Sequence, residues 1–205
     1  MIPSPKAVNI LKIDLKFNDD DLKRISKFTK YLLLTNKKYN LISQSSENDV
    51  WTRHILDSAQ LVKFIDFGHD SSLSDLGSGG GFPGIILSIF NKNPRFHVKL
   101  YEKSPIKAKF LEDAIKLVGS DAKVIKGDLF CQSIDSRYVV CRAFKKIDKL
   151  IQVSREICIK PHKFIILKGK NAQDELEKAM KNKIFKYSLE NSITSKDSKI
   201  VIWNR

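Results

Sequence analysis

The spacing of apolar residues changes near residue 70. Before that point, apolar positions recur every three or four residues, which is typical of helices packed on one side. After Ser72, short apolar runs alternate with helical stretches. This alternation predicts an α/β domain with a mainly parallel sheet. We therefore expect a helical N-terminal extension over residues 1–70, packed on an α/β core over residues 71–205, so that the chain forms one compact unit.

Two helices are expected in the N-terminal part. Asp19–Asp21 provides a helix start, and Leu22, Ile25, Phe28 and Leu32 follow at helical spacing. A second helix is predicted over Asn48–Ile65. Its apolar side contains these residues: Trp51, Ile55, Val62 and Ile65.

The strands are predicted from the short apolar runs that follow. The expected parallel strands are Leu73–Leu76, His97–Glu102, Lys123–Lys126, Tyr138–Cys141 and Lys163–Leu167. Ile184–Leu189 and Lys199–Trp203 flank a polar turn and resemble an antiparallel pair. A parallel sheet that ends in an antiparallel hairpin is, by analogy, the layout of class I methyltransferases, a Rossmann-like fold.

One helix between these strands has clear boundaries. Ser104 can cap it, Pro105 fits its first turn, and Gly119 can end it in the left-handed conformation. The helix between them has an apolar stripe, so we expect it to pack against the sheet.

The segment Asp75–Gly84 reads Asp-Leu-Gly-Ser-Gly-Gly-Gly-Phe-Pro-Gly and links the first expected strand to a helix. Because the glycines of this turn have no side chains, its backbone amides and a helix N-terminus can approach a ligand closely. The turn favours a cofactor that contains adenosine. Gly79-x-Gly81-x-x-Gly84 matches the dinucleotide fingerprint, whereas Asp75-x-Gly77-x-Gly79-x-Gly81 matches the methyltransferase pattern, so the glycines alone leave both cofactor classes open.

Acidic residues follow three neighbouring strands. Asp75 can meet the amino group of a methionine moiety, or can cap the turn that follows it. Glu102 ends the next strand, where a carboxylate can accept both ribose hydroxyls. Asp128 can lie beside an adenine, with Leu129 and Phe130 forming its slot, or can cap a helix.

Charge and cysteine content narrow the class of protein. The 205 residues include 37 Lys and Arg against 23 Asp and Glu, a formal net charge of +14. Such a balance favours a nucleic-acid partner. Cys131, Cys141 and Cys158 are far apart in sequence and are expected to be reduced core residues. We expect no metal site, no membrane span and a cytoplasmic location.

Six sequence motifs in a fixed order carry a resemblance to a known family. They are Lys38–Ser43 (KYNLIS), Arg53–Ser58 (RHILDS), Asp75–Gly84, Lys109–Leu111 (KFL), Arg142–Phe144 (RAF) and Leu167–Gly169 (LKG). Together they resemble the bacterial glucose-inhibited division protein B family, the small-subunit ribosomal RNA methyltransferase G, which methylates N7 of one guanine in 16S rRNA. The likeness runs from about Asp21 to the C-terminus.

The resemblance implies where S-adenosylmethionine binds. It assigns Gly77, Phe82, the backbone of Leu129 and Phe130, and Arg142 to the cofactor. With Asp75, Gly79, Gly81 and Glu102, these form the expected cofactor-binding set. Family members often have Asp at the position of Glu102, and Ala-Glu or Val-Glu where this chain has Leu129-Phe130.

The expected catalytic residues are Arg142, Phe144, His54 and Lys168. Arg142 can hold cofactor or base, and Phe144 can stack on the target base. His54 belongs either to a polar network that docks the N-terminal helices or to a polar wall that faces RNA. Lys168 can contact phosphate or guanine O6, or can face solvent.

We therefore expect a 16S rRNA guanine-N7 methyltransferase that uses S-adenosylmethionine. Its partner is the small ribosomal subunit, with no DNA or membrane partner, and the chain is expected to be a monomer. Two alternatives remain: a nicotinamide-dependent oxidoreductase and a non-catalytic RNA-binding assembly factor.

Overall fold

The computed structural model describes residues 4–142, 144–180 and 186–205. Its N-terminal part is helical throughout. The elements are α1 (Pro5–Asn9), η1 (Ile10–Asp14), α2 (Asp19–Tyr39), α3 (Gln44–Glu47), η2 (Trp51–Leu56), α4 (Asp57–Ala59) and η3 (Gln60–Phe64).

The rest of the chain alternates strands with helices. In order, the elements are β1 (Ser71–Leu76), α5 (Gly84–Phe90), β2 (Phe96–Glu102), α6 (Pro105–Val118), β3 (Lys123–Lys126), η4 (Leu129–Cys131), β4 (Tyr138–Arg142), α7 (Ile147–Glu156), β5 (Lys163–Lys168), α8 (Ala172–Met180), β6 (Tyr187–Asn191) and β7 (Lys199–Asn204).

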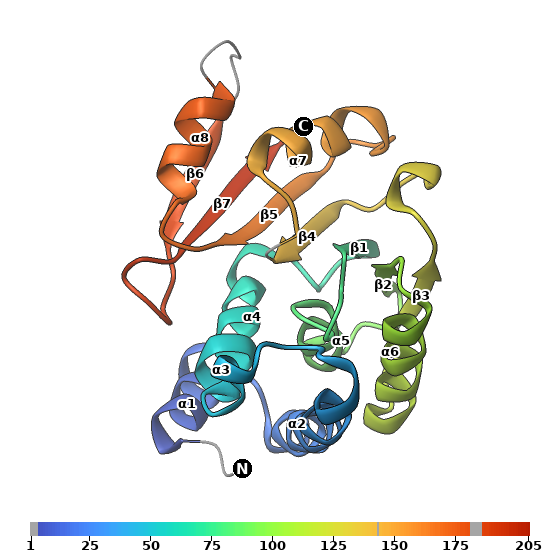
Figure 1. Ribbon diagram of the computed structural model, residues 1–205, viewed down its shortest axis with the longest axis vertical. Coiled ribbons are helices and arrows are strands. Elements are labelled where there is room, and N and C mark those ends of the chain that lie inside the picture. Colours follow the sequence, from blue (N-terminus) through green and yellow to red (C-terminus); the bar gives the residue numbers. More distant parts are fainter. Residues whose placement is uncertain (1–3, 143, 181–185) are drawn as a thin grey trace.

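The strands form one seven-stranded sheet in the order β3-β2-β1-β4-β5-β7-β6. Strands β1 to β5 are parallel to one another, and β7 pairs antiparallel with both β5 and β6. The predicted mainly parallel sheet with an antiparallel end is thereby confirmed. β1 and β4, which are separated by two further strands in the sequence, lie side by side at the centre (Figure 1).

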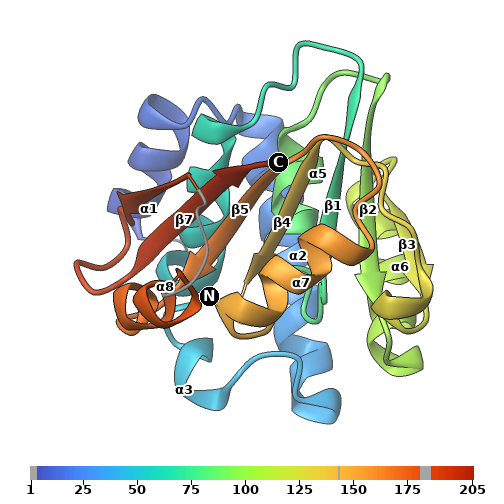
Figure 2. The same cartoon turned by 90° about the horizontal axis from the view of Figure 1, so that it is seen from above.

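Helices cover both faces of the sheet (Figure 2). Side chains alternate between faces along each strand, so Val139 and Cys141 join the core under α7 and α8, whereas Val140 joins the core on the opposite face. That second core also contains residues of α2, η2, α5 and α6. The N-terminal helices therefore share one hydrophobic core with the sheet.

Two of the helix predictions can be compared directly with the structure. The helix α6 is capped by Ser104 and ends at Gly119, whose φ is +62°, as predicted. The helix predicted over Asn48–Ile65 is confirmed for residues 50–64, but its winding is not uniform. Residues 51–64 form a π-helical, an α-helical and a 3₁₀ segment in succession, and Trp51 and Ile55 of the predicted apolar side are buried in the core.

The start of α2 differs from the prediction in its capping residue. Asn18, not an Asp, is the N-cap, and its side chain accepts a hydrogen bond from the backbone of Asp21. The Asp21 carboxylate accepts in return from the backbone of Asn18, which completes a capping box.

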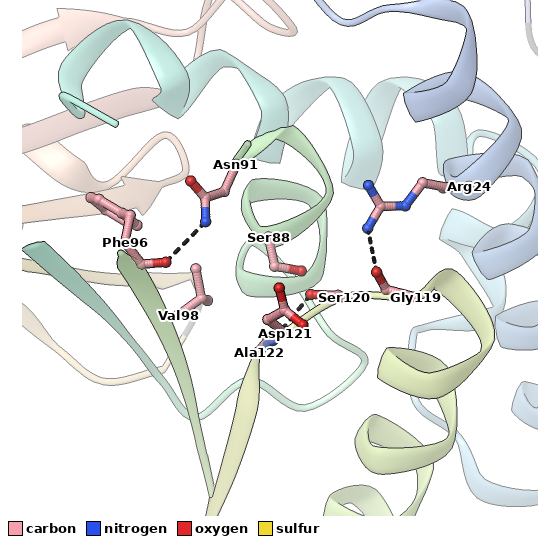
Figure 3. Close-up of a pocket in the computed structure, with 9 residues that line it drawn as sticks. All are labelled: Arg24, Ser88, Asn91, Phe96, Val98, Gly119, Ser120, Asp121 and Ala122. Carbon is pink, nitrogen blue, oxygen red and sulfur yellow. Dashed lines mark hydrogen bonds between the residues drawn. The ribbon is translucent and has the colours of Figure 1, made fainter. Parts of the chain in front are cut away.

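Arg24 connects α2 to the ends of two other helices. Its Nε donates to the carbonyl of Val118 at 2.7 Å, its Nη2 to Gly119 at 3.0 Å and its Nη1 to Ile89 at 3.4 Å. These carbonyls belong to the C-terminal ends of α5 and α6, which have no partner within their own helices. Figure 3 shows Arg24 at the edge of the small cavity between these ends. Arg24 therefore fixes the N-terminal helices to the α/β core.

We expect Arg24→Met to lower the free energy of unfolding by about 2 kcal/mol, because three carbonyls lose a charged donor. Lys23→Met, at the neighbouring exposed position of the same helix, is the matched control and should change stability little. Urea denaturation of the two variants measures the difference. Equal stability of both variants would contradict the role of Arg24.

Candidate functional site

The turn after β1 has a backbone that only glycine adopts easily. Gly77, Gly79 and Gly81 have φ values of +69°, +52° and +91°. The backbone N–H groups of Gly77 and Ser78 both donate to the carbonyl of Tyr101, at 2.9 and 3.0 Å. The end of β2 thus anchors the turn from one side.

Glu102, the last residue of β2, extends this anchor. Its Oε2 accepts a hydrogen bond from the N–H of Gly79 at 2.9 Å, and its Oε1 from the N–H of Ser104 at 2.8 Å. The carboxylate therefore links the glycine turn to the start of α6. Each oxygen retains a second lone pair, so Glu102 can still accept from a ligand in the cavity that it lines.

Asp75 holds the same turn from below. Its side chain is fully buried, and its Oδ2 accepts from the N–H of Gly84 at 3.0 Å. Burial raises the pKa of this carboxyl to about 7. The structure thus has Asp75 capping the start of α5, the second of the two roles considered for it, and its contact with a methionine amino group stays a prediction.

A cavity of about 380 Å³ opens above the glycine turn at the carboxyl ends of β1, β2 and β3. Its lining includes five of the expected cofactor residues: Gly77, Gly79, Glu102, Leu129 and Phe130. We call it the turn cavity. Gly81 and Phe82 do not belong to its lining. Gly81 faces the side chains of Ile85 and Phe28, and Phe82 is buried.

Aromatic side chains close the turn cavity on one side. A Cβ built on Gly77 would lie 2.2 Å from the ring of Phe144, so this ring covers the turn directly. The Nζ of Lys145 lies over the rings of both Phe144 and Phe130, at 5.2 and 5.6 Å from their centroids. Phe144, expected to stack on a target base, thus lies on the cofactor side here, and Lys145 lines the same cavity.

Asp128 performs the capping role that the sequence left open. Its Oδ1 accepts from the N–H of Phe130 at 3.0 Å, and its Oδ2 pairs with Lys103 at 2.6 Å. The cap positions the Leu129–Phe130 backbone at the wall of the turn cavity.

A second cavity, of about 430 Å³, lies at the carboxyl ends of β4 and β5. We call it the arginine cavity. It is lined by Ser43, Ser46, Asp49, Thr52, Arg53, His54, Asp57, Arg142, Leu167, Lys168, Gly169, Thr194, Ser195 and Ser198. Residues far apart in sequence thus meet here: the η2–α4 segment, the ends of two central strands and the loop between β6 and β7.

Arg142 joins the N-terminal segment to the end of β4. Its Nη1 donates to the carbonyl of Arg53 at 2.7 Å, and its Nη2 donates to Nδ1 of His54. The guanidinium also lies over the ring of Phe82, 5.4 Å from its centroid. Arg142 therefore docks the helical extension beside the cavity, while two of its five N–H groups are used in these hydrogen bonds.

His54 is neutral and its tautomer is fixed by its neighbours. Burial, followed by the charges of Arg142 and Arg53, lowers the pKa of its imidazole to about 3. Because a guanidinium can only donate, Nδ1 is the acceptor and Nε2 carries the hydrogen, which it shares with Ser46 Oγ at 2.8 Å. His54 also stacks on Phe82. Both nitrogens are engaged, so His54 positions Arg142 and the polar network, and general base catalysis is not its role.

Lys168 is largely buried rather than solvent-facing. Its Nζ donates to the carbonyl of Lys145 and to Glu175 Oε2, both at 2.7 Å. The lysine thus ties the end of β5 to α8 and to the segment after β4. It lines the arginine cavity, and its contact with RNA stays a prediction.

The cysteines are not all in the core. Cys141 and Cys158 are buried, but Cys131 is exposed, so the expectation of three core cysteines is wrong for that residue. Cys131 ends a short 3₁₀ segment in which Leu129 is buried. Burial raises the pKa of the Cys141 thiol, which leaves it protonated and unreactive.

Two absences hold for residues 4–142, 144–180 and 186–205, the part of the chain that the structure describes. No helix there is long and apolar enough to cross a membrane. Within the same residues, His, Cys, Asp and Glu side chains form no cluster of three that could hold a metal ion.

The buried Asp75 gives a pH-dependent prediction. In the folded protein the pKa of this carboxyl is about 7, whereas its reference value is 3.8. Between these values the folded state binds more protons, so the free energy of unfolding should fall as the pH rises through 7. From pH 5 to pH 8, wild type should lose about 3 kcal/mol relative to Asp75→Asn. Urea titrations of both proteins across this range check it, and parallel pH profiles would contradict it.

The comparisons with known proteins agree with this geometry. A family model described as rRNA small subunit methyltransferase G matches residues 21–201. A ribosomal RNA small subunit methyltransferase G of Rickettsia felis is 36% identical over 88% of this chain and 91% of its own length. The Rickettsia bellii protein of the same name is 39% identical over 81% of this chain and 84% of its own length.

Solved structures with low sequence identity share the fold. A SAM-dependent methyltransferase from Aquifex aeolicus superposes with a TM-score of 0.59 at 10% identity, over 82% of this chain and 96% of that one. A SAM-dependent O-methyltransferase from Thermotoga maritima gives 0.56 at 14% identity, over 73% and 64%. The expected class I methyltransferase fold is confirmed, and the nicotinamide alternative is not favoured. Because the family model matches most of its length, this chain belongs to the rRNA small subunit methyltransferase G family.

Proposed function

We propose that this chain transfers the methyl group of S-adenosylmethionine to N7 of a specific guanine in 16S rRNA. One observation carries the proposal within the family assignment: the turn cavity and the arginine cavity flank the end of β4, where a cofactor and an acceptor base can meet. This is the carboxyl edge of the central strands, where open α/β sheets bind their ligands.

The turn cavity fits the cofactor. Its volume of about 380 Å³ is in the range of small-molecule sites. Gly77 and Gly79 leave its floor free of side chains, Glu102 offers an acceptor for ribose hydroxyls, and Leu129 with Phe130 offers an apolar wall. When bound there, S-adenosylmethionine supplies an electrophilic methyl group on a sulfonium.

The residues of the site suit an acceptor that needs no deprotonation. Guanine N7 carries a free lone pair at neutral pH, so the protein has to align the base and shape the local field. His54 has both ring nitrogens engaged and Cys141 is buried as a thiol, so neither is poised as a base. Arg142 and the polar lining of the arginine cavity orient the base instead.

The RNA partner follows from charge. The net charge of +14 favours a polyanion, and lysines such as Lys103, Lys107 and Lys145 surround the turn cavity. We place the reaction on the small ribosomal subunit in the cytoplasm, with the chain acting as a monomer.

The defining experiment is transfer of labelled methyl from S-adenosylmethionine to small subunits isolated from cells that lack this modification. Nuclease digestion and mass spectrometry should show one 7-methylguanosine. Arg142→Ala should reduce the rate at least tenfold, because the polar network at the cavity is lost. Binding of the subunit without any methylated product would overturn the proposal in favour of a non-catalytic assembly factor.

A separate prediction concerns the cofactor. Gly77→Ala places a Cβ against the Phe144 ring at a φ of +69° and should weaken S-adenosylhomocysteine binding at least tenfold. Gly169→Ala is the matched control, since its Cβ meets no atom within 4 Å. Calorimetric titration measures both affinities, and an unchanged affinity in the Gly77 variant would place the cofactor elsewhere.

A further inference from the structure

The two oxygens of Asp57 have different surroundings. Oδ1 accepts hydrogen bonds from Gln60 Nε2 at 2.9 Å, Thr194 Oγ1 at 3.1 Å and Ser192 Oγ at 3.4 Å. Among the described residues, the polar partner of Oδ2 is Arg142, with Nη1 at 3.7 Å, which is an ion-pair distance rather than a hydrogen bond. The side chain is 15% exposed and lines the arginine cavity. One oxygen thus holds the β6–β7 loop, and the other keeps its acceptor capacity.

A carboxylate oxygen that faces a cavity can accept a hydrogen bond from a ligand that enters it. Burial raises the pKa of Asp57, because the hydrogen bonds to Oδ1 and the charge of Arg142 do not fully replace its hydration. A ligand N–H at Oδ2 would add a hydrogen bond without removing any of those at Oδ1.

The surrounding charges argue against phosphate as that ligand. Lys168 is already paired with Glu175, and Asp57 itself would repel an anion in the same space. Arg142 retains N–H groups beyond those used on Arg53 and His54. A donor and an acceptor side by side match the edge of a neutral base, and 430 Å³ is room enough for one nucleoside.

Methyl transfer to N7 requires that the enzyme recognise the base by the edge next to N7. Guanine and adenine both present N7 as an acceptor, so alignment on N7 alone does not distinguish them. They differ next to it: guanine has the O6 acceptor with N–H donors at N1 and N2, whereas adenine has an N6 donor beside an unprotonated N1. A carboxylate oxygen accepts from guanine and repels the N1 lone pair of adenine.

We propose that Asp57 is a specificity-determining residue: its Oδ2 accepts a hydrogen bond from the N1–H and N2–H edge of the target guanine, while Arg142 donates to O6. This inference rests on the proposed function and deepens it. It gives the Arg53–Ser58 motif two roles, since Asp57 orders the β6–β7 loop through one oxygen and selects the base through the other.

Asp57→Asn tests the second role with little disturbance of the first. The amide oxygen can keep the position of Oδ1, where three donors require an acceptor, and the amide nitrogen then replaces Oδ2 by a donor. Ser192→Ala is the matched control, because it removes a donor to Oδ1, leaves Oδ2 unchanged and lies outside the lining of the arginine cavity. S-adenosylhomocysteine affinity, measured on all three proteins, reports whether the fold and the turn cavity are intact.

The measurement is kcat/KM for methyl transfer to two kinds of unmodified small subunit. One has the target guanosine, whose position mass spectrometry identifies, and the other has adenosine at that position. For guanosine subunits, Asp57→Asn should lower kcat/KM about 10- to 100-fold, with unchanged S-adenosylhomocysteine affinity. The ratio of adenosine to guanosine rates should rise at least tenfold in Asp57→Asn and stay at the wild-type value in Ser192→Ala.

The outcomes separate this inference from the proposed function. If wild type methylates guanosine and Asp57→Asn does not raise the adenosine-to-guanosine ratio, Asp57 only orders the loop and its role in specificity is overturned. A wild-type protein that methylates no guanine in the subunit overturns the proposed function, and this inference with it.

Discussion

The site depends on acceptors for the backbone N–H groups of the glycine turn. A turn without side chains has few contacts of its own, so its shape is set by what its amides bind. The parallel register pairs Leu76 with Tyr101, which places the carbonyl of Tyr101 and the carboxylate of Glu102 directly beside the turn. Asp75 supplies the acceptor from below. Strand register and two carboxylates thus determine the floor of the turn cavity.

On the other side of β1, a single guanidinium organises the second cavity. Arg142 extends from the end of β4 and satisfies the Arg53 carbonyl and His54 Nδ1. Burial lowers the pKa of Arg142, and the carboxylate of Asp57 opposes this effect. Since a buried charge is tolerated only where it is compensated, the helical extension and the end of β4 specify each other's position. The extension is therefore part of the site as well as a cover for the sheet.

Much of the fold was predictable because local sequence and tertiary structure agree there. The strands were predicted to within two residues at β1 to β5, where apolar runs end at polar or glycine residues. For the predicted strand Ile184–Leu189, residues 184 and 185 lie outside the described residues, and the strand is observed at Tyr187–Asn191. The irregular winding of residues 51–64 is not indicated by any spacing in the sequence.

The sequence predicted which residues form the site better than it predicted how those residues lie relative to one another. Gly77, Gly79 and Glu102 line one cavity because strand ends in a parallel sheet meet at one edge. The path of the turn decides that Gly81 faces the core instead. The contacts of Asp57 with Ser192 and Thr194 span more than 130 residues, and no spacing in the sequence indicates them. The boundary near residue 70 stays a prediction, although the shared core shows the two parts packed together.

The titratable groups around the two cavities favour alignment over proton transfer. His54, with a pKa of about 3, is neutral at physiological pH, and its nitrogens are committed to Arg142 and Ser46. Asp75 has a pKa of about 7 but lies beneath the turn, away from both cavities. A site arranged in this way can hold donors and acceptors in fixed directions without exchanging protons with a ligand. That property suits a nucleophile with a free lone pair, and it leaves base identity to be read by fixed polar atoms.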